Sequence, residues 1–157
     1  MDLNKVQKLP VLSAQSIELL NLVQPLCQRT KHEETNMTYG LSMGGVDIRI
    51  DQDVEILPGE FRLASSMELF NLPTFVMGTC YNKSTLARRG LNVLTTILEP
   101  NWRGFLTLEM SNVSKESIYL PMGSPIAQIV FSLLDKPTRI PYEGKYQNQK
   151  RGIQEAL

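Results

Sequence analysis

The chain has 157 residues, which is long enough to bury a hydrophobic core and most simply forms one domain. Its 16 basic residues balance its 16 acidic residues, so the overall charge does not favour binding to nucleic acid or to a membrane surface. Two cysteines are too few for a disulfide framework, and we find neither a secretory apolar segment nor an apolar run that could cross a bilayer. We therefore expect a cytoplasmic protein in which Cys27 and Cys80 are small buried hydrophobes rather than nucleophiles.

The N-terminal part, residues 1–38, is expected to contain one short helix and a loop. Residues 13–20 begin with a serine and carry an apolar stripe, which predicts a helix, whereas residues 31–38 are charged and polar and predict a mobile loop. Beyond this point, Gly and Pro divide the chain into short segments in which apolar and polar residues alternate. These segments are residues 46–50, 60–65, 105–112, 117–120 and 126–133. Many short strands with frequent turns indicate an all-β barrel or sandwich rather than βαβ units.

The C-terminal tail, residues 142–157, is polar and has few apolar residues that could anchor it. A segment of this composition is disordered by itself, or it becomes ordered by binding a ligand. We expect it to be a flexible extension of a single domain that spans residues 1–157.

Residues 83–91 combine basic side chains, a hydroxyl group and a glycine in one short region. They predict a helical turn that Gly90 closes in the left-handed conformation. Ser84 and Arg88 are four residues apart, so they share a face of such a turn. The free backbone N–H groups at its start, with Lys83 beside them, could hold an anion such as a phosphate. The alternative is an ordinary solvated surface with salt bridges.

The stretch 105–111 alternates with a period of two residues, as a strand with one buried face does. The residues on one face of this strand are Phe105, Thr107, Glu109 and Ser111. A glutamate in such a position is either a solvated surface residue or a catalytic carboxylate.

Both regions resemble the dCTP deaminase branch of the trimeric dUTPase superfamily. Members typically show G-[KR]-S-S-L-[AG]-R-x-G-[LI] followed by I-D-P-G-[WFY]-x-G-x-[IL]-[TV]-L-E-[LF]-x-N, and the counterparts here are residues 83–91 and 98–112. Further matching blocks follow the same order at residues 45–50, 57–68, 123–131 and 144–149. The resemblance implies a mainly β, distorted jelly-roll β-barrel of the dUTPase type with short helices. It also implies a homotrimer whose active sites are built from neighbouring subunits and closed by the tail.

The activity implied by the resemblance is the conversion of dCTP and water to dUTP and ammonia. In this family Glu109 would shuttle the protons, while Ser84 and Arg88 would position and polarise the water and the base. Zinc-dependent cytidine deaminases instead carry H-x-E and P-C-x-x-C signatures. This chain has a single histidine, His32, and two isolated cysteines, so we expect no zinc.

The resemblance further implies a set of contacts to the nucleotide. The matching positions are Lys83, Glu99, Trp102, Tyr142, Lys145, Tyr146 and Gln149. In this family Mg²⁺ accompanies the phosphates, and such an ion would sit on the nucleotide with few direct protein ligands. The alternatives are an ordinary polar C-terminus for the tail residues and a core or rim position for Trp102.

The main departure from the family pattern is Glu99, because both branches usually carry aspartate at this position. That residue contacts the sugar in deaminases and activates water in dUTPases, so two other functions stay open. One is a dUTPase, or a bifunctional enzyme that cleaves dUTP onward to dUMP and pyrophosphate. The other is a catalytically silent nucleotide-binding or sequestering protein. Asp47 and Arg49 are expected to form an internal ion pair with a structural role.

Overall fold

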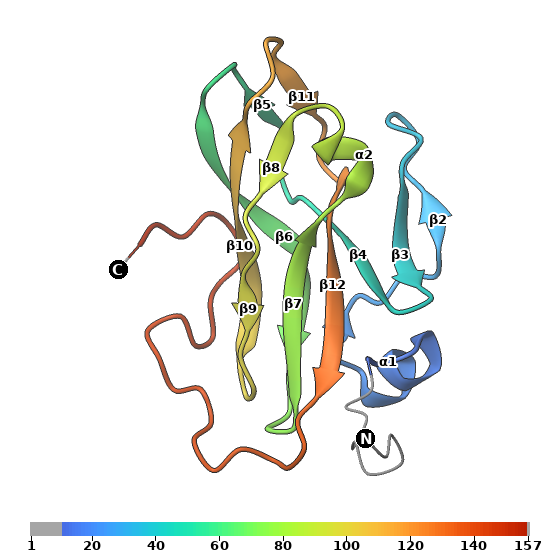
Figure 1. Cartoon of the computed structure of the whole chain (residues 1–157), viewed down its shortest axis with the longest axis vertical. Coiled ribbons are helices and arrows are strands. Elements are labelled where there is room, and N and C mark those ends of the chain that lie inside the picture. Colours follow the sequence, from blue (N-terminus) through green and yellow to red (C-terminus); the bar gives the residue numbers. More distant parts are fainter. Residues whose placement is uncertain (1–10, 157) are drawn as a thin grey trace, which may run out of the picture.

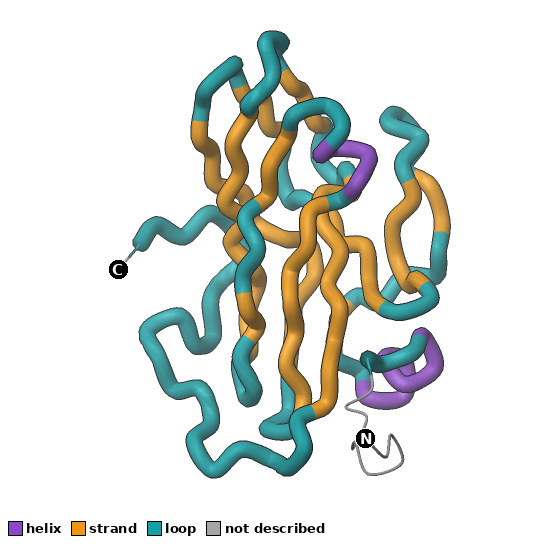
Figure 2. Tube along the Cα trace, in the orientation of Figure 1, coloured by secondary structure: helices purple, strands orange, loops and turns teal. Residues whose placement is uncertain are grey.

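The computed structural model describes residues 11–156, and within them the chain consists mainly of β-strands (Figure 1, Figure 2). The elements are α1 (Ala14–Leu20), β1 (Val23–Gln24), β2 (Thr30–Lys31), β3 (Thr38–Ser42), β4 (Gly45–Arg49), β5 (Val54–Ile56), β6 (Phe61–Asn71), β7 (Val76–Asn82), α2 (Ser84–Ala87), β8 (Leu91–Val93), β9 (Ile97–Leu98), β10 (Arg103–Asn112), β11 (Ile118–Leu120) and β12 (Pro125–Leu133). Neither helix in this part of the chain has the length and apolar character that crossing a membrane would need.

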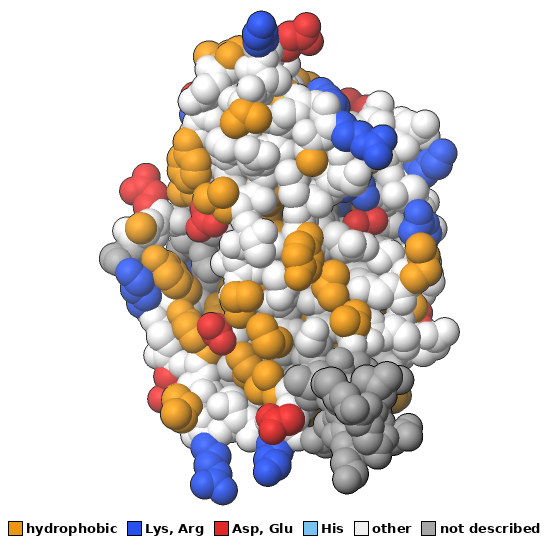
Figure 3. Space-filling view, viewed as in Figure 1, with side chains coloured by type: hydrophobic (Ala, Val, Ile, Leu, Met, Phe, Trp, Pro, Cys, Tyr) orange, Lys and Arg blue, Asp and Glu red, His pale blue; other side chains and the backbone are white. Residues whose placement is uncertain are grey.

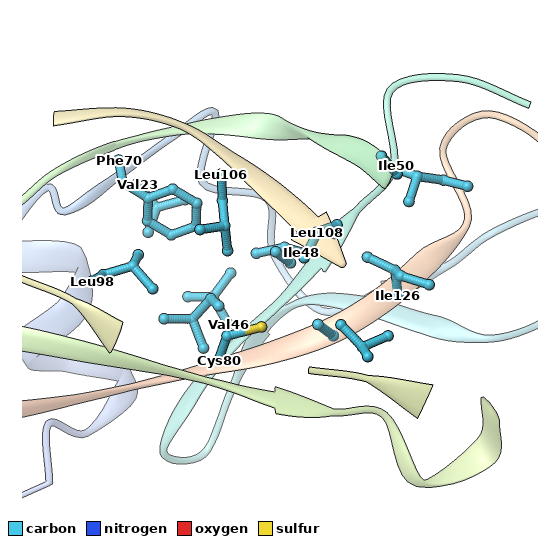
Figure 4. Packing of buried hydrophobic residues seen from close by; sticks show 14 of the residues in the cluster. Val23, Val46, Ile48, Ile50, Phe70, Cys80, Leu98, Leu106, Leu108 and Ile126 are labelled. Carbon is cyan, nitrogen blue, oxygen red and sulfur yellow. The ribbon is translucent and has the colours of Figure 1, made fainter. Parts of the chain in front are cut away.

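The strands of residues 11–156 form three sheets with antiparallel pairing. One sheet has four strands in the order β1-β6-β10-β8, and another has six in the order β2-β3-β4-β12-β7-β9. The third is the pair β5–β11, which lies at the top of Figure 1. Buried side chains of the two large sheets belong to one hydrophobic cluster, and Figure 4 shows them pointing toward one another. The mainly β fold with short helices is therefore confirmed.

Strands β6 and β10 pair along most of their length, and the alternation of β10 decides which of its side chains are buried. Leu106, Leu108 and Met110 point into the core, where they are 7%, 1% and 0% exposed. Thr107 and Glu109 lie between them on the opposite, half-buried face, as the sequence predicted. A register slip of one residue would exchange the two faces, so burial of the apolar set fixes the direction of Glu109.

The N-terminal part confirms the predicted helix and places the predicted loop between two short strands; residues 1–10 lie outside the described residues. Helix α1 buries Ile17 and ends at Asn21 in the left-handed conformation. Within the predicted loop 31–38, residues 32–37 form the connection of a hairpin between β2 and β3, and the mobility of this loop stays a prediction. There His32 N donates to Met37 O at 2.9 Å. Polar residues are compatible with such a turn because they can bond to nearby backbone groups.

The predicted ion pair between Asp47 and Arg49 is wrong, because each residue has another partner. Arg49 Nε donates to Glu68 Oε1 at 2.8 Å, which ties β4 to β6 across the core. Burial raises the pKa of Glu68, although the hydrogen bonds and the charge of Arg49 oppose this. Asp47 Oδ2 instead lies 3.0 Å from Lys83 Nζ. Asp47 and Arg49 therefore belong to two separate ion pairs, and their structural role stays a prediction.

Phe70 on β6 should contribute strongly to stability because it joins the two large sheets. It is fully buried, and its ring centroid lies 6.1 Å from that of Trp102 and 6.5 Å from that of Phe131. We expect Phe70→Ala to lower the free energy of unfolding by about 3–5 kcal/mol, because it leaves a cavity in the core. Phe61→Ala on the same strand removes an exposed ring and should cost less than about 1 kcal/mol. Denaturant unfolding measures both values, and equal losses would contradict this account of the core.

Candidate active site

A cavity of about 780 Å³ lies beside the β6–β10 pair and gathers most of the predicted site residues. Its walls come from these two strands, from the segment that precedes β10 and from the C-terminal tail. The predicted residues that line it are Glu99, Trp102, Glu109, Tyr142, Tyr146 and Gln149. The fold therefore brings together two regions that are distant in the sequence.

Glu109 faces this cavity because β10 directs its alternate side chains away from the core. Leu63 on β6 is in register with Glu109, and Leu94 N donates to Glu109 O at 2.9 Å. Phe61 and Leu63 line the cavity beside its half-buried side chain. A carboxylate that borders both apolar side chains and an open cavity can exchange protons with a molecule bound there.

Cys80 on β7 lies close enough to Glu109 to respond to its charge. Burial, together with this charge, raises the pKa of the Cys80 thiol to about 12. The thiol is therefore protonated at neutral pH, and it is fully buried, as expected for a small hydrophobe. Cys27 is only half-buried, and Arg49 Nη2 donates to its Sγ at 3.5 Å. The predicted burial is thus confirmed for Cys80 and only partial for Cys27.

Trp102 belongs to both the core and the cavity. Its side chain is 5% exposed and packs against Phe70, as the core alternative predicted. It also lines the cavity, and its Nε1 donates to Tyr146 O at 2.8 Å. Trp102 therefore connects the hydrophobic core to the C-terminal tail.

The tail lies against the start of β10 and is held there by hydrogen bonds (Figure 1). Asn148 N donates to Arg103 O at 2.8 Å, and Phe105 N donates to Gln149 O at 3.0 Å. Gln149 Nε2 donates to Thr107 Oγ1 at 2.5 Å, two residues before Glu109 in the sequence. The flexibility that its composition suggests stays a prediction, and residue 157 lies outside the described residues.

Helix α2 lies away from this cavity and presents the two other predicted catalytic residues to the outside. Leu86 is buried and anchors the turn, and Gly90 has a φ of 84°, which confirms the predicted helical turn and its left-handed end. Ser84 and Arg88 are both exposed, and neither lines the cavity. Figure 1 places α2 at the upper right and the tail at the left. A single chain thus does not bring Ser84 and Arg88 together with Glu109.

The two lysines predicted to contact the triphosphate also lie outside the cavity lining. Lys83 forms its ion pair with Asp47 at side-chain exposures of only 11% and 9%. Lys145 is exposed, and its Nζ lies 5.0 Å from the ring centroid of Tyr146. Lys145 thus lies next to one residue of the cavity lining, Tyr146, whereas Lys83 forms a largely buried ion pair.

The charged residues of the cavity lining are all acidic in the part of the chain that the structure describes. They are Glu99, Glu109 and Glu155, and the lining includes no Lys, Arg or His. Phosphate groups are held in proteins by cations and by N–H donors, so the cations for a triphosphate would have to come from outside this lining. Nor do residues 11–156 group three His, Cys, Asp or Glu side chains that could hold a metal ion.

Sequence reasoning missed several residues of this region. Thr95, Thr96 and Thr107 line the cavity but were not predicted as site residues. The alternation of β10 had placed Thr107 on the same face as Glu109, and this was the signal that could have identified it. Gln147 was also missed, although it contacts the turn that leads into β10. No local pattern indicates this contact, because its partners are distant in the sequence.

The family model for dCTP deaminase-like proteins matches residues 28–134 of this chain. The chain belongs to this family. The dCTP deaminase of Acidobacterium capsulatum is 31% identical to it, with 84% of this chain and 89% of the relative covered. The dCTP deaminase of Thermococcus kodakarensis is 37% identical, with 71% and 77% covered. The dCTP deaminase of Roseiflexus castenholzii is 42% identical over 66% of this chain and 58% of its own length.

Solved structures show that this dCTP deaminase-like chain has the dUTPase-type fold. The 2′-deoxycytidine 5′-triphosphate deaminase of Agrobacterium tumefaciens superposes with a TM-score of 0.64 at 14% identity, covering 82% of this chain and 49% of the other. The EIAV dUTPase gives a TM-score of 0.57 at 20% identity, with 79% and 97% covered. The dUTPase of phage phi11 of S. aureus, described with a structural Mg(II) ion, gives 0.56 at 15% identity, with 89% and 99% covered. At these identities the likeness concerns the fold.

The ion pair between Asp47 and Lys83 should stabilise this family member through its burial. We expect Asp47→Asn to lower the free energy of unfolding by about 3 kcal/mol, because it leaves the Lys83 ammonium group buried without its counter-charge. The double variant Asp47→Asn/Lys83→Met removes both charges and should be more stable than Asp47→Asn alone. A double-mutant cycle by denaturant unfolding measures the coupling, and additive losses would contradict a direct ion pair.

Proposed function

We propose that the chain catalyses the zinc-independent hydrolytic deamination of dCTP, which gives dUTP and ammonia. The observation that carries this proposal is the position of Glu109 on the cavity wall in a member of the dCTP deaminase-like family. The dCTP deaminases named above cover most of this chain, which supports the same substrate. The apolar side chains of Phe61 and Leu63 beside the Glu109 carboxylate suit a pyrimidine base, whose ring is flat and must exchange protons during the reaction.

In the proposed mechanism Glu109 is the group that moves protons. It takes a proton from water while the water oxygen forms a bond to C4 of cytosine, and it delivers that proton to N3. The proton of the new C4 hydroxyl then passes through Glu109 to the amino group. The C4–N bond breaks, ammonia leaves and C4 keeps a carbonyl oxygen. Glu109 is a carboxylate again at the end of the cycle.

Ser84 and Arg88 would position the water and polarise the base, and we propose that they come from a neighbouring copy of the chain. Their exposure on α2, away from the cavity that contains Glu109, supports a site shared between subunits. So does the absence of cations from the described cavity lining, because Arg88 could supply the missing positive charge. A homotrimer is the closed assembly that the family resemblance implies, and its symmetry would repeat the same contact three times.

The nucleotide contacts follow from the residues around the cavity. Trp102 and Tyr146 would border the base and sugar, while Gln149 and Lys145 would reach the phosphates from the tail. Mg²⁺ on the phosphates would reduce their charge before they approach the acidic lining. Lys83 would contribute to phosphate binding only where its pair with Asp47 leaves an N–H free.

A second activity, cleavage of dUTP to dUMP and pyrophosphate, is favoured by one observation. Glu99 lines the same cavity as Glu109 and occupies the position of the carboxylate that activates water in dUTPases. Its extra methylene group lets the carboxylate reach further than aspartate would. Release of pyrophosphate from dUTP by the wild type, and its loss in Glu99→Gln, would add this activity to deamination.

We expect Glu109→Gln to abolish dCTP turnover, with a decrease in kcat of at least about a hundredfold, because the amide cannot carry protons. The affinity for dCTP should stay close to that of the wild type, since the side chain keeps its size and position. Incubation of both proteins with dCTP and Mg²⁺, followed by chromatography of the products, measures turnover, and titration calorimetry measures binding. Unchanged turnover in the variant would refute the mechanism, and dCTP binding by a wild type that forms no product would indicate a silent nucleotide binder.

Mixing two inactive variants tests whether the site is shared between subunits. Glu109→Gln chains retain Arg88, and Arg88→Ala chains retain Glu109. After the two are mixed in equal amounts, unfolded and refolded together, about a quarter of the shared sites should hold both wild-type residues in a closed homo-oligomer. We therefore expect about a quarter of wild-type turnover to return. No recovery in a mixture that refolds to the same oligomer would place both residues of each site in one chain.

A further inference from the structure

The side chain of Gln147 uses all of its hydrogen-bonding capacity. Its Nε2 donates to Asn101 O at 2.7 Å and to Tyr142 O at 3.0 Å. Its Oε1 accepts hydrogen bonds from Arg103 N at 2.8 Å and from Asn148 N at 3.2 Å. An amide has two N–H donors and one oxygen with two lone pairs, so these four bonds fix the orientation of the side chain.

Through these bonds Gln147 joins two segments that are far apart in the sequence. One is the turn before β10, which contains Glu99 and Trp102, and the other is the tail. Asn101 in this turn has a φ of 72°, and its Nδ2 donates to Tyr142 O at 3.3 Å. The side chains of Gln147 and Asn101 thus bond to backbone groups of both segments and hold the turn against the beginning of the tail.

The position of the tail beyond Gln147 is closely determined. Gln149 forms a parallel bridge with Gly104, and a Cβ atom on Gly104 would lie only 2.8 Å from Gln149 N. Tyr146 O accepts its bond from Trp102 Nε1 on the other side of Gln147. Tyr146 and Gln149 line the cavity that contains Glu109, whereas Gln147 does not.

We propose that Gln147 is a positioning residue of this site: it fixes the tail beside β10 so that Tyr146 and Gln149 face the same cavity as Glu109. Gln147 itself does not reach the cavity, so it would act only through the segments that it joins. The inference rests on the proposed function as far as catalysis is concerned. Its structural part, the docking of the tail, can be measured without any substrate.

Trp102 provides that measurement, because it is the only tryptophan in the chain and its indole N–H bonds to the tail. Gln147→Glu keeps the size of the side chain but replaces its two donors with an oxygen that faces two carbonyl groups. We expect the fluorescence emission of Trp102 to shift to longer wavelength and its quenching by acrylamide to increase, as the tail leaves the indole. Gln15→Glu makes the same chemical change on an exposed residue of α1 and should alter neither reading. The midpoint of thermal unfolding should stay within about 3 °C of the wild type in both variants, because the core is untouched.

The kinetic constants separate a positioning role from a merely structural one. In Gln147→Glu we expect KM for dCTP to rise on the order of tenfold, because two hydrogen bonds that hold the binding surface are lost, with a smaller change in kcat. An unchanged Trp102 emission, or a shifted emission with unchanged kinetic constants, would overturn the proposal. If the wild type does not deaminate dCTP, the proposed function fails, and the Kd for dCTP then replaces KM in the same comparison of variants. An equal Kd in wild type and Gln147→Glu would overturn the positioning role in that case.

Discussion

The alternation of β10 is the constraint on which the rest of the site depends. Burial of Leu106, Leu108 and Met110 between the two large sheets leaves the backbone one register, and that register turns Thr107 and Glu109 toward the cavity. Hydrophobic burial therefore determines where the proposed catalytic carboxylate points, although Glu109 takes no part in that burial. The first residues of β10 also form hydrogen bonds with the tail. The position of β10 therefore determines both the wall that carries Glu109 and the wall that the tail forms.

The tail completes the cavity through backbone hydrogen bonds to β10, which add to the side-chain hydrogen bonds of Gln147 and Gln149. Gln149 extends the edge of β10 as a strand would, and Gly104 provides the space for this close approach. Trp102 covers the junction from the side of the core and donates its indole N–H to the tail. The tail has one apolar contact with the core, through Tyr142, and hydrogen bonds to the end of a strand hold the polar residues that follow.

The parts of the structure that could be predicted from the sequence are those that local patterns encode. The faces of β10, the helical turn with Gly90 at its end and the helix α1 follow from periodicity and from capping residues. The partners of charged and polar side chains could not be predicted in this way. Asp47 pairs with Lys83 rather than with Arg49. Lys83 lies between β7 and α2, distant from Asp47 in the sequence, so no local pattern indicates this pair. Gln147 was missed for the same reason. The loop at residues 31–38 was predicted, but the pairing of the two short strands that it connects was not.

Negative and positive side chains lie in different parts of this chain. A deaminase must hold a neutral base next to a carboxylate and a polyanion next to cations, and these two requirements conflict within a few ångströms. In this chain the cavity supplies the carboxylates, while the exposed cations Arg88 and Arg89 lie at α2. Lys83 is occupied by Asp47 and helps to hold the start of α2 against β4. If α2 were fixed beside Glu109 in the same chain, Arg88 would form an ion pair with the carboxylate that must stay free to exchange protons. In the proposed shared site a second copy would deliver the cations. This pairing would then be absent from the isolated chain, and both kinds of charge would come together only where subunits meet around a nucleotide.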